Sequence, residues 1–318
     1  MLGSSKHLDF AYLGNRWYRM VGDHRGLDPQ TAPPMAGQSG RQELMSFNVP
    51  ANDWRQDTPY YLPSGVQQAF PDDAYTIARR GEAFVFAVAT AHTLPPFQPP
   101  GKATQMWGRI MAYKPGVGYR DAGAMPMEII GDRSWRGTYD AVLDRFVIPA
   151  AYNDLVWVVI DGATGADLTR RGSGGAAATA GNHDFHVAGI VGDETSRTRY
   201  VYDHLKSELW SVNLDTFALV KLATLPEPAA SGTATLKLAW HPDRRAVVLA
   251  ANRMHAFEVD TGKLTSWDRQ DGLATPQGRV PPSTIFFDPE SRDLVTIGGI
   301  DWNGGVYSPF YWRIRITP

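Results

Sequence analysis

One pattern of short alternating segments recurs along nearly the whole chain. Its clearest copy, residues 237–267 (KLAWHPDRRAVVLAANRMHAFEVDTGKLTSW), has four such segments separated by tight polar turns. Alternation of apolar and polar residues over a few positions, with many Val, Phe, Trp and Ile residues, is typical of half-buried β-strands. Each copy therefore predicts an antiparallel meander of four strands.

Six copies of the pattern can be aligned. Their equivalent first-segment positions follow one another at intervals of about 50 to 60 residues, the period of propeller blades. These positions are Tyr12, Tyr75, Tyr139, Ile190, Trp240 and Phe287. A four-stranded sheet cannot bury both faces alone, and radial stacking buries them while leaving only short outer edges. The sequence predicts an all-β chain folded as a six-bladed β-propeller of four-stranded antiparallel blades.

This pattern predicts a single propeller domain over residues 1–318. The last unit stops at YWRIRITP, just after its third strand, although the first unit already has a first strand in HLDFAYLG. Either the last blade has three strands, or its outer strand is missing or comes from another chain. The expected blades are residues 6–56, 72–122, 136–170, 185–222, 235–267 and 282–318.

Composition narrows the classes of function. The 318 residues are 43% hydrophobic and 20% charged, which is sufficient for a sizeable core. The net charge of -2 offers no general attraction to phosphate backbones, so no nucleic-acid partner is expected. The absence of cysteine excludes disulfides, thiolate nucleophiles and Cys-ligated metals. No cofactor is expected.

Targeting signals are not visible in the sequence. The start, MLGSSKHLDF, lacks a basic segment leading into an apolar run. Nowhere do about 18 uncharged apolar residues follow one another, so no membrane insertion is expected. These features favour a cytoplasmic or virion-associated protein.

Certain glycines and aromatic residues carry a family resemblance. They are Gly22 in RMVGD, Gly298 and Gly299 in TIGG, Phe47 with Trp54, and Phe257 with Trp267. This pattern resembles the kelch repeats of galactose-oxidase-like propellers. Only the first unit keeps the family's aromatic-to-tryptophan spacing, and only the last keeps its double glycine. The resemblance implies a propeller that binds partners, in most members without catalysis, and the family's Tyr–Cys copper site cannot form without cysteine.

Long connections are expected on one face of the propeller, where second strands lead to third strands and blades lead to one another. Long loops on a rigid scaffold often carry binding residues. The predicted binding residues are Arg25, Tyr60, Tyr61, Trp107, Tyr152, Asn153, His186, Trp302, Asn303 and Tyr307. The alternative is that they only cover the blade ends. The expected connections are residues 23–42, 57–73, 90–107, 171–185, 223–235, 268–282 and 300–310.

Candidate catalytic groups lie in the same connections, namely Asp23, His24, His92 and His183. A carboxylate and an imidazole could perform acid–base chemistry on a bound substrate. In GDHRGLD, an Asp–Arg pair bracing the loop is the structural alternative, with Asp28 as a further carboxylate.

The stretch GNHDFH contains His183, Asp184 and His186, a two-histidine, one-carboxylate set. Its spacing is not diagnostic of a metal site, and capping or loop bracing is the alternative. No metal is predicted.

Two functions follow from these features. The first is a non-catalytic binding or assembly module that docks onto a protein or glycan through its long-loop face, as a homo-oligomer or as a phage tail or fibre component. The second is a hydrolase or lyase acting on a saccharide at the mouth of the central channel. An enzyme requires titratable groups that converge in a partly dry pocket, whereas a docking module requires a broad exposed surface.

Overall fold

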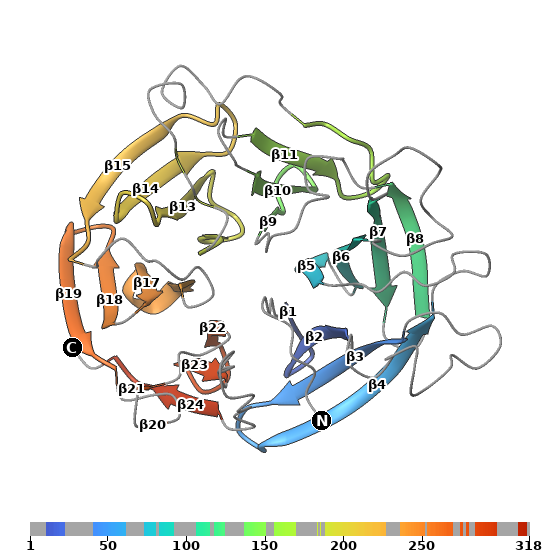
Figure 1. Ribbon diagram of the computed structural model, residues 1–318, viewed down its shortest axis with the longest axis horizontal. Coiled ribbons are helices and arrows are strands. Elements are labelled where there is room, and N and C mark those ends of the chain that lie inside the picture. The colour runs from blue at the N-terminus through green and yellow to red at the C-terminus, as the bar shows by residue number, and fades with distance from the viewer. Residues whose placement is uncertain are drawn as a thin grey trace. The chain divides into compact units, whose positions relative to one another are not determined.

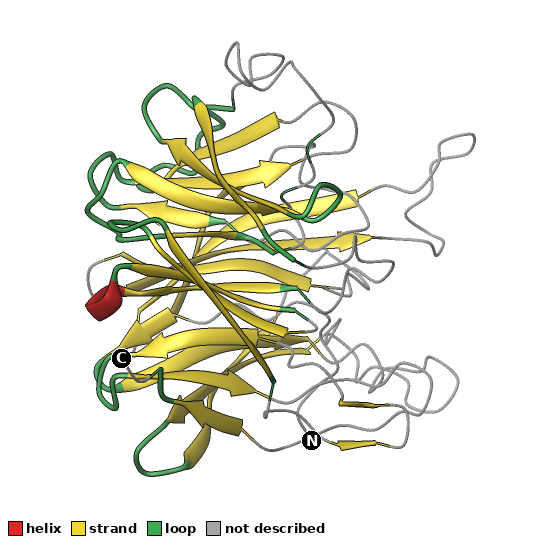
Figure 2. Cartoon of the chain, turned by 90° about the vertical axis from the view of Figure 1, so that its left-hand side faces the viewer, coloured by secondary structure: helices red, strands yellow, loops and turns green. Residues whose placement is uncertain are grey.

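The computed structural model describes residues 11–22, 41–61, 73–80, 83–91, 106–114, 118–124, 137–150, 156–169, 183, 185, 188–226, 236–251, 253–269, 274–275, 278–279, 284–297 and 311–316. Strands and their turns make up nearly all of them, and one short helix, η3 (Pro242–Arg244), lies among them (Figure 2). No helix in these ranges has the length and apolar character needed to cross a bilayer. The chain groups into two compact units, Met1–Ser134 with Ile160–Asp167, and Trp135–Val159 with Leu168–Pro318.

The first unit contains two four-stranded antiparallel sheets whose strand order follows the chain. Arg16, at the start of the second strand, fastens the first sheet, because its guanidinium donates to Ser46 Oγ at 2.8 Å and to Asp53 Oδ2 at 2.9 Å. One sheet comprises β1 (Ala11–Leu13), β2 (Arg16–Gly22), β3 (Arg41–Asn48) and β4 (Asp53–Tyr61), and the other β5 (Asp73–Arg80), β6 (Ala83–Ala91), β7 (Met106–Lys114) and β8 (Gly118–Ala124).

The described residues of the second unit form four further antiparallel sheets of three or four strands, and a two-stranded hairpin (Figure 1). The three-stranded sheets are β9 (Thr138–Asp140), β10 (Arg145–Ala150) and β11 (Val156–Asp161), and β22 (Thr284–Asp288), β23 (Asp293–Ile297) and β24 (Tyr311–Ile314). The last two residues of β11 are grouped with the first unit.

Its two four-stranded sheets are β12 (Ile190–Val191), β13 (Thr198–Asp203), β14 (Glu208–Asn213) and β15 (Leu219–Thr224), followed by β16 (Lys237–His241), β17 (Ala246–Ala250), β18 (Arg253–Glu258) and β19 (Lys263–Asp268). A small hairpin, β20 (Ala274–Thr275) with β21 (Gly278–Arg279), lies in the connection that follows.

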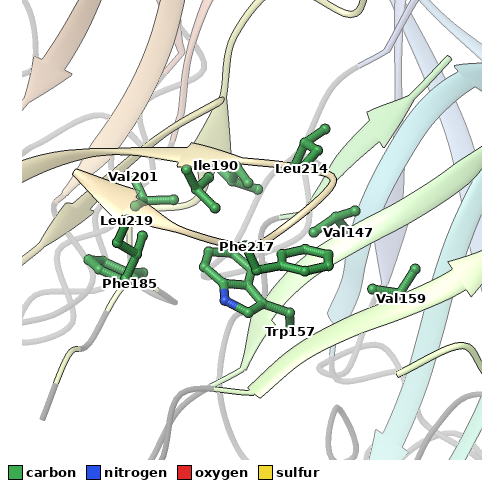
Figure 3. Packing of buried hydrophobic residues seen from close by; sticks show 10 residues of the cluster. Val147, Trp157, Val159, Phe185, Ile190, Val201, Leu214, Phe217 and Leu219 are labelled. Carbon is green, nitrogen blue, oxygen red and sulfur yellow. The ribbon is translucent and has the colours of Figure 1, made fainter. Parts of the chain in front are cut away.

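Successive sheets of the second unit pack through apolar clusters. Val147, Trp157 and Phe217 belong to the cluster that joins the β9–β11 sheet to the β12–β15 sheet (Figure 3). The two faces of strand β17 belong to two different apolar clusters. Val247 and Leu249 join the cluster shared with β12–β15, whereas Val248 and Ala250 join the cluster shared with β22–β24. Because both faces of β17 are buried, its sequence AVVLA is apolar throughout instead of alternating.

The predicted strand pattern is confirmed in the described residues. The six equivalent positions Tyr12, Tyr75, Tyr139, Ile190, Trp240 and Phe287 lie in β1, β5, β9, β12, β16 and β22, each the first strand of its sheet. The described residues are nearly all β, in antiparallel sheets, as expected. Four of these sheets have the predicted four strands, whereas the β9–β11 and β22–β24 sheets each have three within the described residues. The arrangement of six blades around one axis stays a prediction.

Candidate functional site

Each meandering sheet has two ends with different connections. The turns from first to second strand and from third to fourth strand leave at one end, here named the turn end. The chain from second to third strand, and from the fourth strand to the next sheet, leaves at the other end, here named the connection end. This follows from the antiparallel strand order, which equals the chain order. The sequence predicts its site residues at the connection ends.

Three predicted binding residues lie in strands, so their predicted position in loops is wrong. Tyr60 and Tyr61 belong to β4, where they pair with Gln42 and Arg41 of β3. Trp107 belongs to β7 and pairs with Thr90 of β6. Backbone pairing continues past the points where the sequence loses its alternation, and this lengthens both hairpins. All three residues still lie at the connection ends of their sheets.

The remaining predicted residues, apart from His183, lie outside the described residues. They are Asp23, His24, Arg25, Asp28, His92, Tyr152, Asn153, Asp184, His186, Trp302, Asn303 and Tyr307.

His183 lies at a connection end and pairs with a carboxylate that sequence reasoning missed. It precedes β12, and its Nδ1 donates to Oδ2 of Asp203, the last residue of β13, at 2.8 Å. The Asp203 side chain is fully buried and the His183 side chain is 4% exposed. The imidazole stacks on Phe185 at 5.1 Å between centroids and meets Trp210 edge-on at 4.9 Å.

Asp203 also shapes the turn between β13 and β14. Its Oδ1 accepts hydrogen bonds from the backbone N–H groups of Leu205 at 3.0 Å and Lys206 at 3.3 Å. The Lys206 ammonium lies 4.0 Å from Oδ2. A carboxylate that caps its own turn is a common use of aspartate. The stretch YVYDHLKSE, with Asp at the end of an alternating run, is the signal that could have indicated this turn cap.

An imidazole oriented by a carboxylate is the arrangement of a general base. Here, however, Phe185 and Trp210 cover the ring and little of it is exposed. Phe185 itself belongs to the core cluster of Trp157. The His183–Asp203 pair therefore joins the segment before β12 to the β13–β14 turn, and it acts as a brace.

The turn end of the second unit contains a buried ion network centred on Asp140. This fully buried carboxylate accepts from Arg145 Nε at 2.9 Å and from Arg197 Nη1. It also accepts from the backbone N–H groups of Val142 and Leu143. Burial acts to raise the pKa of Asp140, but the hydrogen bonds from Arg197 and Arg145 outweigh it and lower the pKa below the usual 3.8.

Arg199 is fully buried next to this network and donates mainly to neutral acceptors. Its guanidinium reaches the carbonyl oxygens of Ser196 at 2.6 Å, Tyr139 at 3.1 Å and Glu194 at 3.2 Å. Burial lowers the pKa of Arg199, because a charged group loses hydration there. These bonds join β9 to the β12–β13 turn, so the role of Arg199 is structural.

The described residues contain no group of three or more His, Asp or Glu side chains placed to hold a metal ion. Three of their buried carboxylates are engaged in ion pairs, and a fourth, Asp288, accepts a hydrogen bond from the backbone N–H of Ser291. Asp140 binds Arg145 and Arg197, Asp203 binds His183, and Asp293 accepts from two arginines. These pairs connect strands and turns within the second unit.

Comparison with known proteins yields structural similarity only. No protein-family model matches the chain, and no curated protein matches it. A "putative 6-phosphogluconolactonase" from Bacteroides fragilis superposes with a TM-score of 0.52 and 9% identity, covering 98% of this chain and 84% of the other. A second from Bacteroides uniformis gives 0.52 and 10%, covering 98% and 86%. Both are β-propeller-like. The likeness supports a propeller-like fold, and it does not indicate kelch repeats specifically.

Proposed function

We propose that the chain is a non-catalytic binding module: a single six-bladed propeller whose connection ends form the surface that docks onto a protein partner. The main support for this proposal is that each buried carboxylate with an ion pair described above has a structural role. Asp140, Asp203 and Asp293 are each saturated by cations or turn amides. An acid–base site needs such groups held at a cavity that a substrate can enter.

Aromatic residues at two connection ends of the first unit support a docking surface there. Tyr60 and Tyr61 end β4, and Trp107 is the second residue of β7, so the two sheets of the first unit each have aromatic residues at this end. Tyrosine and tryptophan dominate the energetics of protein interfaces, because they bury much area at little conformational cost. The same residue types stack on sugar rings, so glycan docking is the alternative partner. A virion role stays a prediction from the sequence.

The test compares two double variants of the full chain. Tyr61→Ala with Trp107→Ala changes the connection end, and Val142→Ala with Leu143→Ala is the matched control at a turn end. Val142 and Leu143 are 54% and 50% exposed, so their truncation costs little stability. Each protein is used to capture partners from its native extract, with quantification by mass spectrometry and thermal unfolding measured in parallel.

We expect one protein to be recovered equally by the wild type and the control, and at least about tenfold less by the connection-end variant, the loss that truncated aromatic anchors produce. If all three chains recover the partner equally, or if only the control recovers less of it, the proposal that the connection ends form the docking surface is wrong. Recovery that oligosaccharides compete away assigns a glycan instead.

The second candidate, a hydrolase or lyase acting on a saccharide, would depend on the carboxylate-oriented imidazole of His183. Wild type and His183→Gln are incubated with a panel of oligosaccharides. Turnover by the wild type that the folded variant lacks would replace the binding proposal. We expect no turnover by either, because the imidazole is enclosed by Phe185 and Trp210.

A further inference from the structure

A buried histidine lies between two sheets of the second unit. His241 is the last residue of β16, the first strand of its sheet, and is 5% exposed. Its ring packs on Phe287 of β22, with 4.7 Å between the ring centroids. Nδ1 is buried, and within the described part of the chain it has no hydrogen-bond partner. A buried ring nitrogen without a partner is unusual in a folded protein.

Side-chain alternation along β16 directs His241 toward the β22–β24 sheet. Ala239, two residues earlier, belongs to the apolar cluster that also contains Leu294 of β23. Trp240 points the other way and stacks on Tyr200 of β13. The His241 ring therefore lies on the face of β16 that packs against the next sheet, where an uncharged side chain costs least.

The charged groups nearest to His241 are already paired with one another. Asp243 of η3 binds Arg292 of the β22–β23 turn, with Oδ1 2.6 Å from Nη2. Arg244, also in η3, lies 3.9 Å from the carboxylate of Glu258 at the end of β18. A proton on His241 would thus add a positive charge to a set of groups in which each carboxylate has a cation.

The carboxylates of the neighbouring sheet are also engaged. Asp288, the last residue of β22, accepts through Oδ2 from the backbone N–H of Ser291 at 2.8 Å. Asp293, the first residue of β23, accepts from two arginine side chains. Among the described residues, neither carboxylate is a hydrogen-bond partner of His241 Nδ1.

Burial lowers the pKa of His241 below the usual 6.5, because the charged imidazolium loses hydration there. Asp243 and the backbone of His241 itself act against this shift, whereas the positive charges of Arg244 and Arg292 add to it. The packed arrangement thus favours the neutral ring. An imidazolium has an N–H on both nitrogens, so protonation would leave a buried Nδ1–H without an acceptor.

We propose that His241 is an acid-sensitive switch of the contact between β16 and β22, and that its protonation separates the turn ends of the two sheets. Nδ1–H gains an acceptor when water enters between His241 and Phe287. Water at this position also reaches the apolar cluster of Ala239 and Leu294. The switch goes beyond the proposed docking function and does not depend on it.

The direction of the pH effect follows from proton uptake. With its lowered pKa, His241 in the closed contact binds fewer protons than a hydrated histidine does, so the closed contact is fully stable above pH 6.5 and loses stability as pH falls below it. Because opening takes up one proton, its equilibrium constant should rise about tenfold between about pH 7.5 and about pH 5.5. Asp140 acts in a separate range, below 3.8.

The test measures amide hydrogen exchange of the full chain by mass spectrometry at these two pH values, with rates corrected for the intrinsic effect of pH. We expect the amides of β22 and β23 to exchange about tenfold faster at the lower pH. The amides of β13 and β14 should not change. They provide the internal comparison, because the buried histidine beside them, His183, has a carboxylate partner.

Two kinds of variant make the test specific to His241. His241→Phe replaces the imidazole with a ring that does not titrate, and it should abolish the acceleration in β22 and β23. His241→Leu is a second variant without a titrating group, in case the larger ring does not fit. His183→Gln changes a different buried histidine and is the matched control, which should keep the acceleration.

Three outcomes overturn the proposal. They are unchanged exchange of β22 and β23 in the wild type, equal acceleration in β13 and β14, and the wild-type acceleration in a folded His241→Phe or His241→Leu chain. The first two need only the wild-type protein. Partner capture by the Tyr61→Ala, Trp107→Ala variant is measured at neutral pH, so failure of either proposal leaves the other standing.

Discussion

Phe217 stacks on Trp157 with 5.4 Å between ring centroids, although the Phe217 backbone is left-handed, with φ at 58° (Figure 3). The residue lies in the β14–β15 turn, is fully buried and has the Arg145 guanidinium 5.8 Å from its ring centre. The matching position of two other turns is glycine, at Gly165 and Gly262, both also with positive φ. Packing of one aromatic side chain against the neighbouring sheet thus outweighs an unfavourable backbone conformation.

Two substitutions at Phe217 separate the contribution of aromatic packing from the cost of the left-handed backbone. Phe217→Ala should lower the free energy of unfolding by about 3–5 kcal/mol, because it empties a packed site. Phe217→Gly loses the same ring but removes the left-handed strain, so it should be less destabilising by about 0.5–1 kcal/mol. Urea unfolding of both variants checks the order. If the alanine variant were as stable as the glycine variant, the claim that the backbone at residue 217 is strained would be wrong.

Glycine to alanine changes at two turns should differ in size. At Gly262, with φ at 70°, an added Cβ meets nothing within 4 Å, so only the backbone term of about 1 kcal/mol is expected. At Gly192, with φ at 151°, it lies 2.9 Å from Arg199 Cδ, and Arg199 is held by its carbonyl acceptors. Gly192→Ala should cost about 2–3 kcal/mol through overpacking as well as strain. Thermal and urea unfolding of the two variants test this difference. Similar losses of stability in both variants would show that it is wrong.

Asp140 should make stability depend on acid pH. Its pKa is lower in the folded chain than the 3.8 of a free aspartate, so its ionised form stabilises the fold above that value. This contribution is lost as pH falls below 3.8 through the folded-state pKa. Asp140→Asn should cost about 3–5 kcal/mol at neutral pH, because Arg145 and Arg197 lose their buried partner. The unfolding free energy of the variant should fall less steeply from pH 5 to pH 3. Parallel pH profiles for the two proteins would contradict this role.

A double-mutant cycle tests the His183–Asp203 brace. Single substitutions His183→Ala and Asp203→Ala should each destabilise the fold. The double variant should lose less than the sum, with a coupling energy of about 0.5–3 kcal/mol from urea unfolding. Additive losses would show that the 2.8 Å contact does not contribute to stability.

The strands could be predicted from the sequence because each depends on local information. The run AVVLA, the turns at HPDR and DPES, and the aromatic first-strand positions each report the burial of a few neighbouring residues. The last residues of β4 and the first residues of β7 could not be predicted as strand. Their backbone pairing depends on the partner strand and not on alternation in the sequence. Within the candidate site, His183 was identifiable as a candidate, but its partner was not.

The sequence by itself determined the repeated β meanders, since periodic hydrophobicity and turn residues act over a few positions. Only the tertiary structure decided that His183 contacts Asp203, that the Phe217 side chain packs on Trp157 of the neighbouring sheet, and that Arg199 is buried. These contacts form between residues distant in the chain, and their free energy depends on how one sheet packs on the next. No local pattern carries that information.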